Sequence, residues 1–463
     1  HQNVGFEAVD LAAGKFAVKN RFYFTGLKKY QINYAVKANG KVVRKGKTFL
    51  DIEPQGTQEL TVNVAGLQPK AGTEYFVNFW VTTTEPEILI PVGHEIASEQ
   101  FRLPIEPLTV AEHKASGKTN VTTEGDEVKV SSSKMQFVFN KKSGLVTSYK
   151  VNGTEYFTEG FGIQPNFWRG PNDNDYGNGQ PKREQIWKQS SKDFKVADVI
   201  TEADGNNTVL TANYLLAAGN LYIVKYTIYP DGVVHADITF TSTDMEEGKT
   251  EVSEATLMAT FSPGQQEARR AASKLVVPRI GVRFRLPADM NQVEYFGRGP
   301  GENYIDRQRA NHIDLYKTTA DAMYTNNYVR PQENGHRTDT RWVELTRKNG
   351  KGLKIVADQT IGFNALRNSV EDFDSEEAVG KLRQWNNFTP EEIANRSEEK
   401  AKDVLRHMTH INDITPRNFV EVCVDMKQQG VAGFNSWGDR PLPEHTMPAN
   451  QEYKWGFTLI PVK

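Results

Sequence analysis

The sequence predicts an all-β protein built from two sheet domains of unequal size. Residues 1 to 105 contain short segments that alternate apolar and polar side chains, separated by turn residues at regular spacing. From residue 128 such segments continue almost to the end of the chain, without the strand–helix alternation of a parallel α/β fold. Residues 106–127 are poor in large apolar side chains, and we interpret them as a linker.

The first predicted domain reads as an immunoglobulin-like β-sandwich. Apolar residues alternate with polar ones over 32–36, and the segment ends at Asn39-Gly40, a strong hairpin signal. The same alternation recurs over 75–82, and turns are expected at 53–56 and 69–72. About seven strands at this spacing are typical of an immunoglobulin-like sandwich over residues 1–105.

The second predicted domain, residues 128–463, reads as one large sheet-on-sheet domain. Hairpins are expected at Ser143-Gly144 and Asn152-Gly153, and further strands follow to residue 459. A single helix stands out, in which Thr389 is an N-cap, Pro390 suits the first turn and Glu392 completes a capping box. We interpret this helix, which ends near Leu405, as a solvated excursion.

Composition excludes several classes of partner. The 463 residues carry 56 basic and 58 acidic side chains, a net charge of −2, which argues against nucleic acid. No apolar run approaches the roughly 18 residues of a membrane span, so no membrane partner is expected. The single cysteine, Cys423, rules out an internal disulfide framework. The chain begins at His1 rather than methionine and could be a processed piece; a periplasmic or secreted parent is favoured over a cytoplasmic one.

Four polar clusters carry the candidate functional residues. The first spans 166–177 and contains Arg169, Asp173 and Asp175 among turn formers. Its Asn and Asp side chains could cap turns, or they could position a mobile loop hinged at Gly177-Asn178-Gly179.

The second and third clusters span 296–307 and 328–342 and are dense in Arg, Glu and Asn. Buried Arg–carboxylate pairs that brace loops explain this density better than a catalytic His–Glu set does, because nothing marks an acid–base pair. The residues expected to brace loops are Arg169, Asp173 and Asp175 of the first cluster, with Glu302, Asn303, Arg307, Glu333, Asn334, Arg337 and Arg341.

The fourth cluster spans 430–443, with three glycines, two prolines and Trp437, and predicts a shaped loop. From these residues alone Trp437 could plug the core or lie across a sugar ring. His407, His410 and Asp413 precede the loop, but their spacing matches no strong zinc pattern, so no metal site is predicted.

Together these clusters resemble the C-terminal part of glycoside hydrolase family 2 β-galactosidases, the LacZ-like enzymes. The matching segments are 168–175, 299–307, Pro331 to Gly335 with Arg337 and Arg341, and 435–438. The resemblance implies that residues 1–105 are the second immunoglobulin-like sandwich of such an enzyme. It also implies that 128–463 are its terminal, small-chain-like domain, a galactose-mutarotase-like β-supersandwich.

The resemblance also implies where the chemistry lies. A retaining glycosidase needs two carboxyl groups about 5–5.5 Å apart across the scissile bond, and in this family both belong to a TIM barrel. These 463 residues contain no such barrel. We therefore expect no catalytic residue here and no cleavage of galactosides by this chain alone.

For substrate binding, the resemblance implies that Trp437 stacks on the sugar, with Asn435 and Ser436 beside it. The loop from Gly177 resembles the family's mobile active-site loop, although Pro181 and Trp187 depart from its pattern. We expect a galactoside to bind together with the absent barrel and the parent enzyme to be a homo-oligomer. No cofactor is expected here, whereas Mg²⁺ and Na⁺ are suggested for the parent enzyme.

Two alternatives stay open. An aldose 1-epimerase would need a histidine acid and a glutamate base facing one pocket, and His312, His336, His407 and His410 are candidates. A carbohydrate-binding module would need only the sugar surface. Fold alone does not decide between these functions.

Overall fold

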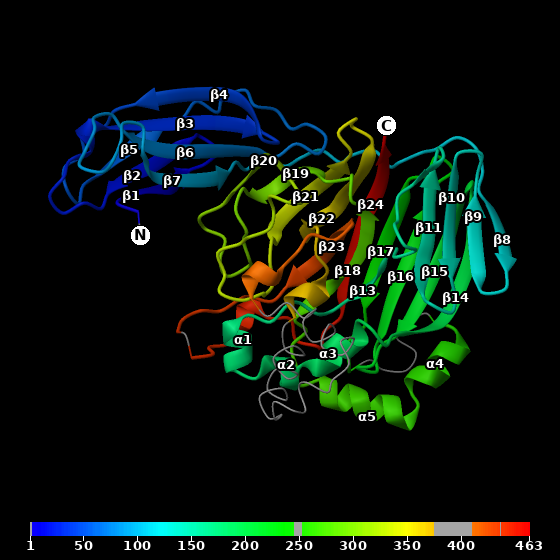
Figure 1. The fold of residues 1–463 in the computed structure, drawn as a ribbon. Helices are drawn as coiled ribbons and strands as arrows, with labels where there is room; N and C mark the ends of the chain where they lie inside the picture. Colours follow the sequence, from blue (N-terminus) through cyan, green and yellow to red (C-terminus); the bar gives the residue numbers. More distant parts are fainter. Residues whose placement is uncertain (1, 245–251, 375–409, 436) are drawn as a thin grey trace. The chain divides into compact units, whose positions relative to one another are not determined.

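The computed structural model describes residues 2–244, 252–374, 410–435 and 437–463. The chain divides into two compact units, residues 1–113 with 312–315, and residues 114–311 with 316–463. Strands dominate both units, which confirms the predicted all-β class (Figure 1). The predicted helix from Thr389 to Leu405 lies outside the described residues, as do His407 and Ser436.

The first unit is a seven-stranded sandwich of two antiparallel sheets, with strand orders β1-β2-β5 and β4-β3-β6-β7. Its core includes stacked Phe6 and Phe79 rings, 4.5 Å apart between centroids, and Phe16 at 4.9 Å from Phe79. Asn39 and Gly40 both have positive φ, 44° and 79°, as a tight hairpin between β3 and β4 requires. The strands are β1 Val4–Asp10, β2 Lys15–Asn20, β3 Tyr30–Ala38, β4 Lys41–Thr48, β5 Thr57–Thr61, β6 Tyr75–Thr83 and β7 Glu95–Arg102.

The predicted linker, residues 106–127, is partly wrong. Strand β8, Asn120–Glu124, lies within it and pairs with β9, Glu127–Ser131. All five residues of β8 are exposed, so this edge strand carries no buried apolar face. Alternation of apolar and polar residues therefore could not reveal it.

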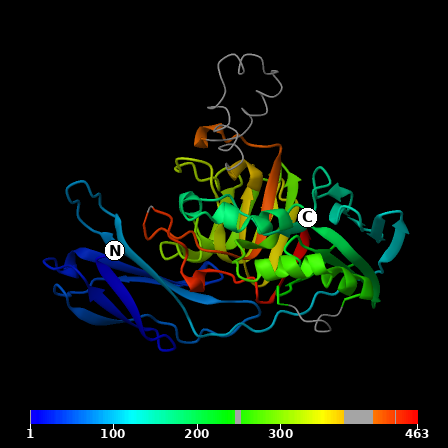
Figure 2. The ribbon, with the colours of Figure 1, turned by 90° about the horizontal axis from the view of Figure 1, so that it is seen from below.

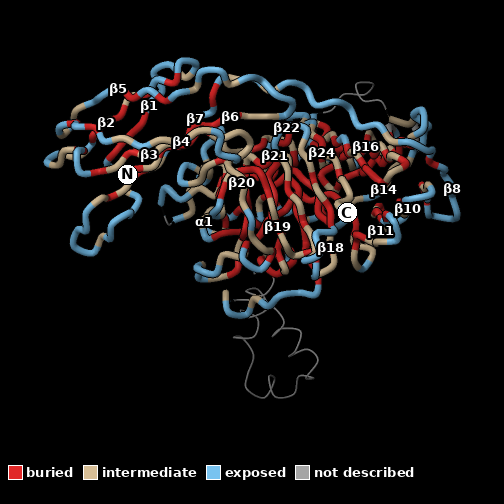
Figure 3. Tube along the Cα trace, turned by 90° about the horizontal axis from the view of Figure 1, so that it is seen from above, coloured by how far each residue is buried: buried red, intermediate tan, exposed pale blue. Residues whose placement is uncertain are grey.

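The second unit packs a five-stranded sheet, β12-β11-β10-β9-β8, against part of a curled twelve-stranded sheet. The twelve-stranded sheet follows the path β13-β18-β23-β22-β24-β17-β16-β15-β14, and β19, β20 and β21 lie off it. Tyr149 on β11 donates a hydrogen bond to the Gly232 carbonyl before β17, and Tyr214 on β15 donates to Gly144 between β10 and β11, at 2.5 and 2.8 Å. The two sheets therefore share one core, and Figure 3 shows buried residues gathered along these strands.

The smaller sheet and its neighbours comprise β10 Met135–Asn140, β11 Leu145–Val151, β12 Thr154–Glu155, β13 Gln164–Asn166, β14 Lys195–Asp204, β15 Asn207–Leu215, β16 Leu221–Ile228 and β17 Val234–Phe240. The remaining strands are β18 Arg279–Pro287, β19 Gln292–Gly299, β20 His312–Thr319, β21 Arg337–Thr346, β22 Gly352–Leu366, β23 Phe419–Gln428 and β24 Tyr453–Val462.

Helices interrupt the strands of the second unit more than the sequence pattern suggested. They are α1 Asp173–Gly177, α2 Gln180–Arg183, α3 Gln185–Ser190, α4 Glu254–Thr260 and α5 Pro263–Ala272, and Figure 1 shows all five at the same end of the strands. Helix α5 had a readable start signal, Ser262 followed by Pro263. None of the helices in the described ranges has the length and apolar character that a membrane crossing would need.

Candidate functional site

The loop that follows β23, residues 430–443, carries Trp437 and is called the Trp437 loop below. It lies beside α1 in two views at right angles (Figures 1 and 2). The Trp437 side chain is 88% exposed, so the interpretation of this residue as a core plug is wrong. The question is what keeps so large an aromatic surface in contact with solvent.

Arg169, which is fully buried, ties the start of the loop to α1. Its Nη2 donates to both carboxylate oxygens of Asp175, at 3.1 and 2.9 Å. The same guanidinium donates to the backbone carbonyls of Gln429 and Gly430, at 2.8 and 3.1 Å. Charge-assisted hydrogen bonds of this kind are stronger than neutral ones, so the beginning of the loop is held firmly.

Asp306 holds the next two residues of the loop. Its Oδ1 accepts from the Val431 amide at 3.0 Å and its Oδ2 from the Ala432 amide at 2.8 Å. The Asn172 side-chain amide donates to the Val431 carbonyl at 3.2 Å. A Cβ on Gly430 would lie 2.3 Å from Asp306 Oδ2, so the close approach of the carboxylate requires glycine here.

The predicted hinge and the Trp437 loop touch through their backbones. Gly177 ends α1, Gly179 precedes α2 with φ of 73°, and a Cβ on Gly438 would lie 2.5 Å from the Gly177 carbonyl carbon. Asn435 Oδ1 accepts from the Trp437 amide at 2.8 Å, a local turn that fixes the backbone at the tryptophan. Mobility at Gly177, Asn178 and Gly179 stays a prediction.

The segment after Gly179 is helical rather than a continued loop. Pro181 lies in α2 and Trp187 in α3, and both side chains are buried. The Trp187 ring lies 5.8 Å from that of Phe240 on β17. These two departures from the family pattern therefore anchor the segment to the core.

A buried ionic cluster lies at the ends of β18 and β23. Arg279, which is fully buried, donates to Glu333 Oε1 at 2.5 Å and to the Trp168 carbonyl at 3.1 Å. Its Nε lies 3.2 Å from Asp425 Oδ2, an ion pair without hydrogen-bond geometry. Burial raises the pKa of Asp425 to about 7; Arg279 opposes this shift and Glu333 adds to it. One guanidinium thus faces two carboxyl groups, of which only Glu333 accepts a hydrogen bond from it.

An open cleft of 830 Å³ lies beside the anchored start of the loop, with Asp306, Glu302, Arg307, Tyr328 and His445 among its lining residues. Glu302 Oε1 accepts from Arg307 at 2.7 Å and from the Tyr328 hydroxyl, and Oε2 accepts from the Gly335 amide at 2.8 Å. Both oxygens of Glu302 are therefore occupied as acceptors, which suits a brace better than a general base.

The remaining predicted bracing residues make comparable contacts. The Asn303 side chain donates a hydrogen bond to the Arg298 carbonyl and accepts one from the Thr338 amide, and the Asn334 side chain accepts from the Thr325 amide and donates to the Thr325 carbonyl. Arg337 donates to the Tyr295 hydroxyl, and Arg341 donates to the Asp339 carbonyl. Asp173 forms an ion pair with Arg330. The structure thus brings the four sequence clusters together: the first meets the third where the Glu333 amide donates to the Gly170 carbonyl, at 2.9 Å. These contacts fit the bracing role that the sequence predicted.

Among the histidines proposed for an epimerase, His336 has its Nδ1 3.7 Å from Asp425 Oδ2, and His407 lies outside the described residues. His336 is buried and stacks on Tyr304 with centroids 5.5 Å apart. Burial, with Arg279 and Arg337 nearby, holds the pKa of His336 well below its usual value, so it is neutral. His312 is half-buried at the start of β20, and His410 is exposed with its Nδ1 3.4 Å from Asp413.

One group of side chains has the donor types of a metal site. His235 Nε2 lies 3.2 Å from Asp237 Oδ1 and 3.7 Å from Asp358 Oδ2. The hydrogen bond to Asp237 raises the pKa of His235, and the charge of Asp358 adds to the shift. An imidazolium between two carboxylates accounts for the group without a metal ion.

Several important residues were not singled out from the sequence. Arg279, Asp306 and Asp425 anchor the site, and of these only Asp306 lies in a segment, 299–307, that the sequence marked as functional. A signal existed: Glu421, Cys423 and Asp425 occupy alternate positions of the otherwise apolar stretch 419–426 of β23 and are buried. Charged residues at inward-facing strand positions mark buried ion pairs.

Known proteins match both units. A family model described as the β-galactosidase small chain matches residues 131–459, and one described as β-galactosidase domain 4 matches residues 16–104. A β-galactosidase of Priestia megaterium is 30% identical over 100% of this chain and 39% of the relative. β-Galactosidases of Halalkalibacterium halodurans and Vibrio cholerae are each 24% identical, over 96% and 97% of this chain and 38% of each relative.

A galactose 1-epimerase from Lactobacillus acidophilus is similar in structure over 75% of this chain and 99% of its own, at 8% identity and a TM-score of 0.37. A score this low carries no argument about function.

The fold and the matched models define the second unit as a β-galactosidase small-chain domain, preceded by a β-galactosidase domain 4. The chain belongs to the β-galactosidase family. It spans about two-fifths of the length of the curated relatives that it matches.

We predict that Asp306→Ala loosens the Trp437 loop. The amides of Val431 and Ala432 would lose their acceptors, at a cost of about 1–3 kcal/mol locally. Hydrogen exchange of peptides covering 430–443 should accelerate, while exchange in β23 changes little. Asp439→Ala, in the same loop and without a hydrogen bond among the described contacts, is the control. Equal exchange in both variants would contradict the anchoring role.

A second prediction concerns pH. Burial raises the pKa of Asp425 to about 7 in the folded chain, above the ordinary value of 3.8, so ionisation of Asp425 lowers the stability of the folded state. The free energy of unfolding therefore falls as pH rises from 4 to 7, by on the order of 4 kcal/mol in total from this group. Asp425→Asn removes that loss, so the difference in unfolding free energy between variant and parent should grow in favour of the variant across this range.

The measurement is urea unfolding at several pH values. Asp126→Asn, at an exposed turn, is the matched control and should show a difference that does not change with pH. A difference for Asp425→Asn that stays constant from pH 4 to 7 would show that Asp425 is ionised throughout.

Proposed function

We propose that this chain is the C-terminal part of a β-galactosidase that hydrolyses terminal β-D-galactosides, and that it supplies an aromatic surface for the sugar. The observation that carries the proposal is an 88% exposed Trp437 on a loop whose start is fixed by Arg169 and Asp306. A mobile indole would fold back onto apolar surface, whereas a fixed one stays available to the apolar face of a galactose ring.

The free energy of stacking a sugar on the indole is large enough to change the affinity measurably. Stacking a sugar on the indole removes on the order of 50–100 Å² of apolar surface from water, worth roughly 1–2.5 kcal/mol. Asn435, whose carboxamide also fixes the Trp437 amide, is exposed beside it and supplies polar groups for sugar hydroxyls. Ser436 is assigned to substrate binding from the family resemblance alone.

The bond-breaking groups belong, in this proposal, to the rest of the parent protein. The matched β-galactosidases are more than twice as long as the chain, which supports a catalytic barrel elsewhere. A retaining mechanism with two carboxyl groups in that barrel follows from the resemblance. The Mg²⁺ and Na⁺ expected for the parent enzyme, and its expected periplasmic or secreted location, stay predictions.

The proposal includes subunit contacts made by the first unit. Phe24, Ile88 and Leu89 are 97%, 92% and 98% exposed. Lys29, close in sequence to Phe24, is paired with Glu87 at 2.5 Å, which brings these two loops together. Exposed apolar groups of this kind mark interaction surfaces, which supports a homo-oligomeric parent.

In the intact enzyme, Trp437→Ala should raise KM for a galactoside about tenfold through the loss of stacking. Trp437→Phe keeps an aromatic face and should recover most of the affinity. Phe434→Ala, 68% exposed in the same loop, controls for a general effect on the loop. Unchanged kinetics in Trp437→Ala would remove the proposed role, and an equal effect of Phe434→Ala would assign it to the loop as a whole.

The 463 residues by themselves should not hydrolyse o-nitrophenyl galactoside, because the acid and the nucleophile lie in the rest of the parent protein. Steady-state assays of the purified chain should give a rate indistinguishable from the solvent blank. Adding the remainder of the parent protein should restore turnover. Turnover that co-purifies with the chain and disappears in Glu302→Gln would contradict the assignment of the chemistry elsewhere.

A further inference from the structure

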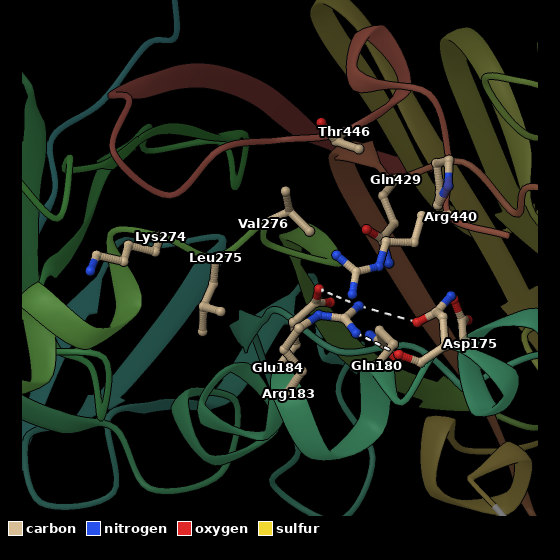
Figure 4. A pocket seen from close by; sticks show the side chains of 12 residues that line it. Asp175, Gln180, Arg183, Glu184, Lys274, Leu275, Val276, Gln429, Arg440 and Thr446 are labelled. Atoms are coloured by element: carbon tan, nitrogen blue, oxygen red, sulfur yellow. Dashed lines mark hydrogen bonds and ion pairs between the residues drawn. The ribbon is translucent and has the colours of Figure 1, made fainter. Parts of the chain in front are cut away.

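A second hollow lies behind the hinge at Gly177–Gly179, between α2–α3, the segment 274–276 and the end of the Trp437 loop. It has a volume of 140 Å³ and is open to solvent on one side. Figure 4 shows Gln180, Glu184, Arg440 and Thr446 among the side chains around it. A single buried water needs only about 10–15 Å³, so the hollow has room for a molecule of about ten non-hydrogen atoms.

Two of its side chains are buried and have polar atoms without partners. Gln180 is 2% exposed and Glu184 is 1% exposed. The Gln180 carboxamide lies close enough to the Glu184 carboxylate to oppose the rise that burial causes in its pKa, but neither polar atom of the carboxamide has hydrogen-bond geometry with a protein group, and Glu184 Oε2 has no such bond either. Buried polar atoms in native proteins are almost always satisfied, so three such atoms at one hollow point to a bound group that satisfies them.

The second oxygen of Glu184 is already engaged. Arg183 Nη2 donates to Glu184 Oε1 at 3.2 Å, and the same guanidinium donates to the Asn178 carbonyl at 2.7 Å. Burial raises the pKa of Glu184, although Arg183 and Gln180 oppose the shift. The unpaired oxygen therefore gains from a neutral donor such as a hydroxyl group.

Charges of both signs line the hollow, which argues against simple ions as its occupant. The free oxygen of Glu184 disfavours an inorganic anion beside it. Arg183 together with Lys274 and Arg440 at the exposed rim disfavours a metal cation. A ligand that both donates and accepts at neighbouring atoms matches the free carboxamide and carboxylate oxygen, and hydroxyl groups do this.

Apolar side chains also line the hollow. Leu275, Val276 and Pro441 line the hollow together with the polar groups. A few placed polar groups among apolar side chains are typical of small-molecule sites. We propose that this hollow binds a neutral hydroxyl-rich small molecule, a monosaccharide or smaller polyol, at a site separate from the Trp437 surface.

Binding there would join two segments that are distant in sequence. Gln180 and Glu184 belong to α2–α3, whereas Arg440, Pro441 and Thr446 follow Trp437. An occupant in contact with both sides restricts their relative motion. It should therefore slow hydrogen exchange in peptides covering 177–190 and 438–446.

The test is a titration of the purified chain with galactose, glucose and glycerol, followed by saturation-transfer NMR and by hydrogen exchange. Binding of at least one of them is expected, with slower exchange in both segments. Gln180→Met preserves side-chain size and removes both free polar atoms, so it should weaken binding about tenfold. Gln185→Met, on the exposed side of α3, is the matched control and should bind like the parent chain.

Arg440→Met, at the solvent-exposed rim, tests the opposite wall in case Gln180→Met unfolds locally. It should weaken binding and reduce the protection of 438–446. Trp437→Ala should leave binding at the hollow unchanged. Inorganic phosphate tests the anion alternative and should not compete.

Several outcomes would overturn the proposal. No binding of the three polyols would leave only water in the hollow, and competition by phosphate would make it an anion site. Binding that persists in both Gln180→Met and Arg440→Met would place the ligand elsewhere. Binding that is lost only in Trp437→Ala would support the aromatic surface and remove the second site, so the two proposals fail separately.

Discussion

Two buried guanidinium groups determine how the loops at one end of the second unit are arranged. A buried charge is tolerated only when it is paired and hydrogen-bonded, and removing one partner of such a pair typically costs about 3–5 kcal/mol. Arg169 and Arg279 meet this requirement with acceptors from different parts of the chain. The segments that supply those acceptors must therefore adopt their positions together. The loops of the site are parts of one arrangement rather than independent connections.

This arrangement explains how a loop can present an exposed indole. Arg169 bonds two consecutive carbonyls at the end of β23, and Asp306 bonds the next two amides. Four successive backbone groups are thus fixed before the loop reaches Trp437. Loops placed by a rigid scaffold commonly carry binding residues, and here the scaffold extends into the loop itself. Asp306 also lines the neighbouring cleft, so that cleft and the loop share a support.

The sequence predicted those features that depend on local chemistry. Asn39-Gly40 forms the expected hairpin, and the glycine-rich segment around Trp437 is the expected shaped loop, whereas its residues alone left open whether Trp437 is buried or exposed. The four polar clusters were recognisable because polar side chains concentrate where loops are braced. What could not be predicted depends on contacts distant in sequence. Strand β8 forms by pairing with β9 and has no buried side chain, so no apolar pattern marks it. The ion pair of Arg279 with Asp425 forms only because β23 places Asp425 beside β18.

The helical turns after Gly179 illustrate the same limit. Helices α2 and α3 are four and six residues long, too short to be stable by propensity alone, and buried Trp187 and Pro181 fix them to the core. Tertiary burial, which local sequence does not reveal, therefore decides this segment. Helix α5 was also not predicted, although its sequence does contain a start signal, Ser262 followed by Pro263.

The backbone contact between Gly177 and Gly438 connects the two proposed sites. A side chain at either position would collide with the other segment, so both glycines are needed for the hinge and the Trp437 loop to pack this closely. The hollow between α2–α3 and the residues after Trp437 lies on the same two segments. If a ligand in the hollow favours their closed arrangement, it also favours one position of the indole. Linkage then requires the reverse effect of equal size: a sugar on Trp437 that prefers this position strengthens binding in the hollow by the same factor.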